Sequence, residues 1–124
     1  MIEIKNLTHL YENSVSGEAI KDINLYIKKG ESVAIIGSSG SGKSTLLKCI
    51  NRLIEPTTGS ILIAGEDIIK CSKKKAETIR SKIGMIFQNF NLLERETVFN
   101  NVLNGRLRYN SSLRTIIKKF SKED

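Results

Sequence analysis

The first third of the chain alternates apolar and polar residues as half-buried strands do. This pattern predicts one strand that starts at Ile2 and a second over 23–27, with a polar loop over 11–18 between them. A turn over 28–31 then leads to a continuous apolar run, 32–36, which predicts a further strand. We therefore expect an antiparallel sheet near the start of the chain, followed by an apolar strand.

The spacing of the apolar residues changes to that of a helix after residue 42. A helix is predicted from Lys43 to about Ile54, because Pro56 disfavours helical geometry at the residue before it. A strand over 60–64 follows, and a turn over 65–67 completes a hairpin. This part of the chain therefore predicts one helix and one hairpin.

The second half of the chain carries shorter signals. Ser72 is placed to cap a helix that ends near Arg80, although three lysines in its first turn oppose the helix dipole. A short strand over 83–87, a loop of amide residues and a helix capped by Thr97 follow. The tail over 106–124 has one apolar helical stripe, which favours docking within its own protein over a membrane anchor.

A glycine-rich segment directly follows the apolar run. Residues 37–45 match G-x-x-x-x-G-K-[ST], a loop whose backbone N–H groups converge on phosphate oxygens at the start of a helix. In this pattern Lys43 reaches the β- and γ-phosphates, and Ser44 binds Mg²⁺ through its hydroxyl. A flexible Gly/Ser linker is the alternative, but a linker does not require Lys-Ser at a fixed distance from its last glycine. The predicted phosphate-contact residues are Gly37, Ser38, Ser39, Gly40, Ser41, Gly42, Lys43, Ser44 and Thr45.

Composition and charge leave the class of partner open. Twenty basic and thirteen acidic side chains give a net charge of +7, which suits anionic partners and equally a lysine-rich soluble surface. Cys49 and Cys71 have no C-x-x-C spacing and no nearby His, which indicates neither a metal site nor a disulfide and fits a reduced, cytosolic setting. The chain has no signal-peptide layout and no apolar run long enough to span a bilayer, so we expect any membrane association to be peripheral.

Three further features narrow the class of phosphate-loop protein. Tyr11 precedes the loop, a hairpin over 56–65 follows the loop helix, and Gln88 ends a predicted strand. Together with the loop they resemble the ATP-binding subunit of an ATP-binding-cassette (ABC) transporter over essentially all 124 residues. The stretches 86–95 and 101–107 are similar to subunits that drive phosphonate import, although importers of amino acids or methionine share the general layout.

The resemblance implies a fold, a ligand and partners. The fold would be an incomplete α/β P-loop NTPase of ABC type within one nucleotide-binding domain, 1–124. Residues 1–87 would form the antiparallel β-subdomain and the phosphate-loop core, and 88–124 the Q-loop and the start of the helical subdomain. Tyr11 would stack on the adenine of ATP, and Gln88 would touch Mg²⁺ and the attacking water. The partners would be transmembrane permease subunits, a substrate-binding protein and a second ATP-binding subunit, at the cytoplasmic side of the cell membrane.

Three motifs of this family are absent from the sequence. It has no Ser-Gly-Gly signature segment, no apolar strand that ends in Asp-Glu, and no histidine after the loop, since its one histidine is His9. Water attack needs such groups, and the loss of a general base alone costs about 10²–10⁴-fold in rate. We therefore expect a truncated chain that binds ATP without turnover. In the family's sheet, strands from the remaining half separate the 32–36 and 83–87 strands, so bare strand edges are expected.

Two other classes of protein remain as alternatives. A small P-loop kinase would need an acceptor-site base, for which the sequence offers no candidate. A nucleic-acid-binding module could use the net charge and the lysines at 73–75. No aromatic platform or helix-turn-helix pattern accompanies that charge, so we do not expect nucleic acid as a partner.

Overall fold

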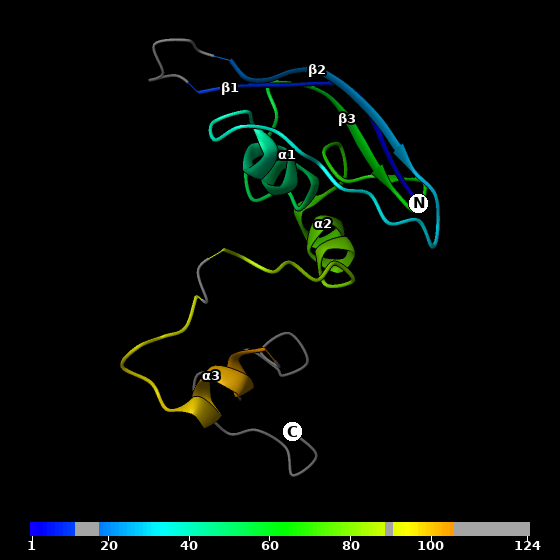
Figure 1. Ribbon diagram of the computed structural model, residues 1–124. Helices are drawn as coiled ribbons and strands as arrows, with labels where there is room; N and C mark the ends of the chain where they lie inside the picture. The colour runs from blue at the N-terminus through cyan, green and yellow to red at the C-terminus, as the bar shows by residue number, and fades with distance from the viewer. Residues whose placement is uncertain (12–17, 89–90, 106–124) are drawn as a thin grey trace. The chain divides into compact units, whose positions relative to one another are not determined.

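The computed structural model describes residues 1–11, 18–88 and 91–105 (Figure 1). The chain divides into two compact units, 1–84 and 85–124, and each is described by itself. The apolar stripe predicted over 106–124 lies outside the described residues, as does most of the polar loop predicted over 11–18. In the described part, no helix is long and apolar enough to cross a membrane.

The first unit is built on an antiparallel sheet of four strands. The strands are β1 (Ile2–Leu10), β2 (Glu18–Ile27), β3 (Thr58–Ile63) and the two-residue β4 (Glu66–Asp67), in the order β2-β1-β3-β4. The alternating patterns predicted the first two strands, although β2 begins at Glu18 and not at the predicted residue 23. The hairpin is also confirmed, but 66–67, predicted as part of its turn, form β4. Since β1 lies between β2 and β3, both of its edges are hydrogen-bonded.

One face of this sheet is covered by α1 (Lys43–Ile50), and α2 (Lys73–Arg80) adds to the same core (Figure 1). Leu7 and Ile61 from the sheet and Cys49 from α1 are completely buried. Burial of this kind contributes about 25 cal/mol for each Å² of apolar surface. The core consists of Ile4, Leu7, Ile20, Leu46, Cys49, Ile50, Ile61, Ile68, Ala76 and Ile79.

Side-chain caps begin two of the helices, as their sequences predicted. The Ser72 hydroxyl accepts a hydrogen bond from the backbone N–H of Lys75 at the start of α2. The Thr97 hydroxyl accepts one from Asn100 at the start of α3 (Val98–Asn104), in the second unit. These bonds satisfy N–H groups that have no partner within the helix.

Helix α1 ends earlier than predicted, at Ile50 rather than about Ile54. Arg52 has a positive φ of 47°, and its N–H donates to the carbonyl of Cys49, which closes the helix in a turn. The Arg52 guanidinium also donates to the carbonyls of Ile68 at 2.9 Å and Cys71 at 3.2 Å. Because these contacts link the end of α1 to the segment before α2, tertiary structure outweighs the helical spacing that continues to Ile54.

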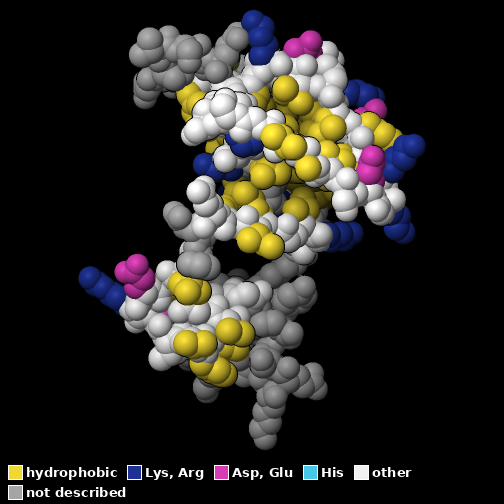
Figure 2. Space-filling view, in the orientation of Figure 1, with side chains coloured by type: hydrophobic (Ala, Val, Ile, Leu, Met, Phe, Trp, Pro, Cys, Tyr) yellow, Lys and Arg dark blue, Asp and Glu magenta, His cyan; other side chains and the backbone are white. Residues whose placement is uncertain are grey.

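The two apolar segments 32–36 and 83–87 are not strands, which corrects the sequence prediction. No described segment pairs with either, and a strand needs a neighbour for its backbone N–H and C=O groups. Ile36 is 93% exposed and Ile86 is fully exposed. Figure 2 shows hydrophobic side chains over the visible face of the first unit. Val33, Ile35 and Ile36 all have exposed side chains.

The second unit contains α3 and the loop that precedes it. The Asn101 side chain accepts from the N–H of Leu93 at 2.8 Å and donates to the carbonyls of Leu93 and Thr97. A single amide thus fastens the loop to the helix. Leu103 is the buried hydrophobic residue of α3.

Candidate nucleotide-binding site

The last glycine of the phosphate loop, Gly42, caps the start of α1. Gly42 has φ +85°, and a Cβ there would collide with the carbonyl oxygen of Ala19 and lie 2.6 Å from Cγ2 of Ile20. Its own carbonyl accepts the first helical hydrogen bond, from Leu46 at 2.9 Å. A residue without a side chain is therefore required here, both for the backbone angle and for the close approach of the loop to β2.

The loop before Gly42 is folded on itself. The N–H of Ser41 donates to the carbonyl of Ser38 at 3.3 Å, and Gly40 has φ +80°. A Cβ at Gly37 would lie 2.6 Å from the Ser41 hydroxyl oxygen, so this glycine makes room for the Ser41 side chain. The turn over 38–41 is therefore formed, although the preceding segment 32–36 pairs with no described strand.

The ammonium group of Lys43 lies against the loop. Its Nζ donates to the carbonyl oxygens of Gly37 at 2.8 Å and Ser38 at 2.6 Å, and to the hydroxyl of Ser41 at 3.1 Å. No acidic residue lies in the first turn of α1. The positive charge of Lys43 and the positive end of the helix dipole therefore act together on any anion bound in the loop.

The next two residues differ in exposure. Ser44 is exposed, so its hydroxyl is open to a ligand, whereas Thr45 is only 9% exposed. The Thr45 hydroxyl lies 3.4 Å from the hydroxyl of Tyr11. The loop motif predicted a backbone role for Thr45, but its sequence spacing gave no sign of this side-chain contact.

Tyr11 connects the end of the first strand to the phosphate loop. Its side chain is 42% exposed, which leaves ring surface for a ligand. The ring meets the imidazole of His9 at right angles, with the ring centroids 4.7 Å apart. The structure therefore brings Tyr11 and the loop helix together, as a base-stacking residue beside a phosphate loop requires.

Gln88 belongs to the second unit, where its side chain is exposed. Its predicted role at the magnesium ion stays a prediction. Within 1–11, 18–88 and 91–105, no group of three or more His, Cys, Asp or Glu side chains is placed to hold a metal ion. The exposed Ser44 hydroxyl is a group of the kind that Mg²⁺ accepts, since this ion prefers oxygen ligands.

A glycine-rich loop that wraps the start of a helix, with a lysine folded over it, is the arrangement of P-loop nucleotide-binding proteins. The sequence model of the ABC transporter family matches residues 20–124. The chain therefore belongs to the ABC transporter family, and its fold is the N-terminal part of an α/β P-loop NTPase of ABC type.

Curated relatives match the whole chain. The Phosphonates import ATP-binding protein PhnC of Lactobacillus delbrueckii subsp. bulgaricus is 52% identical over 100% of this chain and 48% of the relative. PhnC of Bacillus thuringiensis subsp. konkukian is 51% identical with the same coverage. PhnC 3 of Halalkalibacterium halodurans is 46% identical over 100% of this chain and 47% of the relative. The chain thus spans about half the length of the curated relatives it matches.

Solved structures give the same family. The dimeric structure of MJ0796, a bacterial ABC transporter cassette, has a TM-score of 0.77 and 37% identity, covering 98% of this chain and 49% of that chain. A post-hydrolysis dimer of the same cassette, bound to ADP and Pi, has a TM-score of 0.78 and 36% identity, covering 99% of this chain and 51% of that chain. This family assignment favours a transporter subunit over the kinase and nucleic-acid alternatives.

Proposed function

We propose that this chain supplies the phosphate-binding part of the ATP-binding subunit of an importer, and that its loop binds ATP with Mg²⁺. The observation that carries the proposal is the closed loop at 37–45, with Lys43 folded over it and Tyr11 beside it. A bound triphosphate would take the Lys43 ammonium from the loop carbonyls. The bonds from Lys43 to phosphate would join opposite charges, so they would be stronger than its bonds to the neutral carbonyls of the loop.

Each site residue has a distinct role in this proposal. The backbone N–H groups of 37–45 bind phosphate oxygens, Lys43 neutralises the β- and γ-phosphates, and Ser44 binds Mg²⁺. The exposed ring of Tyr11 stacks on adenine. Gln88 keeps the role that the family resemblance implies, at Mg²⁺ and the attacking water. These groups bind and orient the nucleotide, while Mg²⁺, when bound, offsets the charge on its phosphates.

Phosphonate is the proposed cargo. The support is the agreement of three PhnC relatives, 46–52% identical over the whole chain. The proposed partners are transmembrane permease subunits, a substrate-binding protein and a second ATP-binding subunit. The subunit would lie at the cytoplasmic side of the cell membrane, where ATP binding and hydrolysis are coupled to import.

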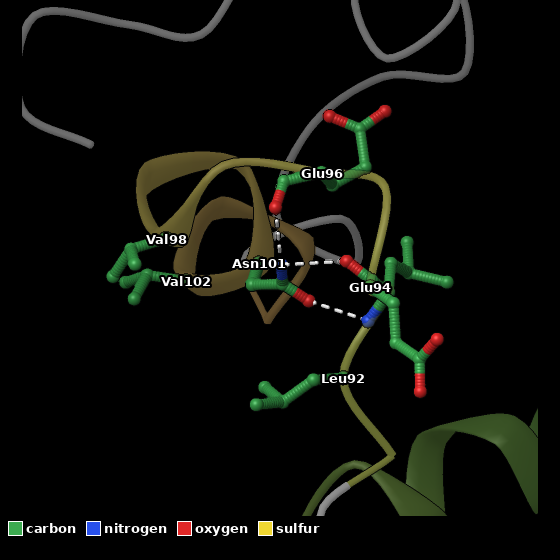
Figure 3. A pocket seen from close by; sticks show the side chains of 7 residues that line it. Leu92, Glu94, Glu96, Val98, Asn101 and Val102 are labelled. Carbon is green, nitrogen blue, oxygen red and sulfur yellow. Dashed lines mark hydrogen bonds between the residues drawn. The ribbon is translucent and has the colours of Figure 1, made fainter.

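The second unit has an apolar pocket that supports a protein partner. The pocket has a volume of about 490 Å³, and Figure 3 shows Val98 and Val102 of α3 and Leu92 of the preceding loop around it. Val98 is 82% exposed and Val102 69% exposed, so both can be covered by another protein. We assign this surface to a permease subunit. Val98→Asp is expected to reduce co-purification with that permease and to leave the melting temperature unchanged; unchanged co-purification would contradict the assignment.

Titration calorimetry of the 124-residue chain with ATP and Mg²⁺ tests the proposed nucleotide site. Lys43→Ala should weaken ATP binding by about tenfold or more, because it removes a charged partner of the phosphates. Lys48→Ala is the matched control, since Lys48 is an exposed lysine in the last turn of the same helix. Equal affinity in both variants, or no binding by the unaltered chain, would overturn the proposal.

Negligible ATP turnover by this chain alone is the second expectation, because the signature segment and the acidic strand are absent from its sequence. A coupled assay of phosphate release measures it. Steady, Mg²⁺-dependent release that Lys43→Ala abolishes would contradict the expectation without contradicting ATP binding.

A further inference from the structure

The contact between His9 and Tyr11 has no role in the phosphate-loop motif. His9 is the next-to-last residue of β1 and pairs with Ile20 of β2. The next residue, Leu10, pairs with Glu18, so the sheet holds the backbone at both positions. Its imidazole meets the Tyr11 ring at an interplanar angle of 90° with centroids 4.7 Å apart. This separation and angle are those of a favourable edge-to-face pair.

The imidazole of His9 is not engaged in a polar network of the described residues. Both of its ring nitrogens are buried, and neither has a hydrogen-bond partner there. A polar side chain that is buried without such a partner loses its hydration. The edge-to-face contact with Tyr11 is a favourable contact that this ring does make, and it places the imidazole against the tyrosine.

Two of the contacts of Tyr11 are with described residues on different elements. The His9 ring supports the aromatic face or edge of Tyr11, and the Thr45 hydroxyl lies 3.4 Å from the Tyr11 hydroxyl. Thr45 is a residue of the loop helix, so the second contact ties the tyrosine to the phosphate site. Both contacts help to set the orientation of the Tyr11 ring with respect to the loop.

We propose that His9 is a positioning residue for base stacking, which holds the Tyr11 ring in the orientation that receives the adenine of ATP. This inference rests on the proposed nucleotide function. A ring that is already oriented loses less conformational freedom when the base binds, and this favours binding. Only the part of the affinity that comes from the base depends on His9, because the phosphates are bound by the loop and Lys43.

Calorimetry with two ligands separates the base from the phosphates. Mg²⁺–ATP and Mg²⁺–tripolyphosphate are titrated into the chain and into His9→Ala, His9→Leu and His9→Phe. His9→Ala and His9→Leu should weaken ATP binding by about two- to tenfold, the range of an aromatic pair, and leave tripolyphosphate binding unchanged. His9→Phe restores an aromatic ring and should keep most of the ATP affinity.

The comparison of His9→Leu with His9→Phe guards against a purely structural effect, since both side chains fill the site and only one is aromatic. An equal loss for both ligands, or equal ATP affinity of these two variants, would overturn the positioning role. Failure of the nucleotide function looks different, because the unaltered chain would then bind neither ligand, or Lys43→Ala would bind ATP as well as the unaltered chain.

Discussion

The segments β1, β2 and β3 and the segment 32–36 are all apolar enough to be strands. The first three pair in a sheet, whereas 32–36 is not a strand. The sheet pairs β1 on both edges and buries Leu7 and Ile61 completely under α1. Segment 32–36 has the same kind of residues, but Ile36 is 93% exposed and no backbone hydrogen bond is recorded for residues 33–36 in the described part of the chain. The phosphate loop thus joins the exposed segment 32–36 to α1, which packs on the sheet. We call the sheet and α1 the covered region.

The difference teaches that strand propensity needs a partner to become structure. A strand adds to stability through its cross-strand pairs and its burial, and neither is present at 32–36. The loop keeps its turn because Gly42 packs on β2 and α1 continues into the core. The covered region is therefore sufficient to shape the loop.

Truncation of a core side chain should show the largest difference between the two regions. Leu7→Ala is expected to lower the free energy of unfolding by about 2–5 kcal/mol, because it leaves a cavity in the core. Ile36→Ala should change that free energy by less than about 0.5 kcal/mol, since this side chain is exposed. Urea denaturation measures both values, and a large effect of Ile36→Ala would mean that the segment is packed.

Gly40 and Gly42 of the loop both have positive φ, and their substitution should lower the free energy of unfolding by different amounts. Gly40→Ala and Gly42→Ala both place a side chain at positive φ, which costs about 1–2 kcal/mol. Only Gly42→Ala collides with β2, so it should cost about 1–3 kcal/mol more.

Thermal and urea denaturation of the two glycine variants provide the measurement. Equal losses of stability would show that the loop does not depend on its contact with β2. A smaller loss for Gly42→Ala than for Gly40→Ala would contradict the packing described here.

Loss of the side-chain cap of α2 should lower the free energy of unfolding less than Leu7→Ala or Gly42→Ala. Ser72→Ala is expected to lower the free energy of unfolding by about 1 kcal/mol, because the N–H of Lys75 loses its side-chain acceptor. Ser72→Asp keeps an acceptor and serves as the control. If both variants lose the same stability in urea denaturation, the cap is not the cause.

The smallest expected effect on stability at neutral pH comes from the ionisation of the Cys49 thiol. Burial raises the pKa of the Cys49 thiol from 9.0 to about 11, so the folded chain keeps this proton where the unfolded chain loses it. Stability from this group is therefore constant below pH 9 and falls as the pH rises from 9 to about 11. Urea denaturation at pH 8 and at higher pH measures the slope, which should be smaller in Cys49→Ala. An unchanged slope in that variant would contradict the burial of the thiol.

Much of the fold follows from local patterns in the sequence. Alternation predicts β1 and β2, and the caps Ser72 and Thr97 predict where α2 and α3 begin. The end of α1 could not be predicted, because Arg52 makes its hydrogen bonds with Ile68 and Cys71, far away in the sequence. The absence of strands at 32–36 and 83–87 has the same origin, since pairing is decided by the rest of the sheet.

The candidate site likewise has features that the sequence predicts and features that only the structure shows. The motif identifies 37–45 as a phosphate loop, because the chemistry requires glycines and Lys-Ser at fixed spacing. The contact between Tyr11 and Thr45 and the ring of His9 against Tyr11 are tertiary features without a sequence signature. The sequence singles out Tyr11 by its position before the loop and by the family resemblance, and the structure places His9 near the end of β1.

Hydrogen exchange of the 124-residue chain, with and without Mg²⁺ and ATP, tests most directly whether the covered region shapes a working phosphate loop. The account predicts slow exchange in β1, β3 and α1 without nucleotide, fast exchange at 33–36, and new protection over 37–45 when ATP is added. Fast exchange throughout the first unit, or no change at 37–45 at saturating ATP, would contradict it.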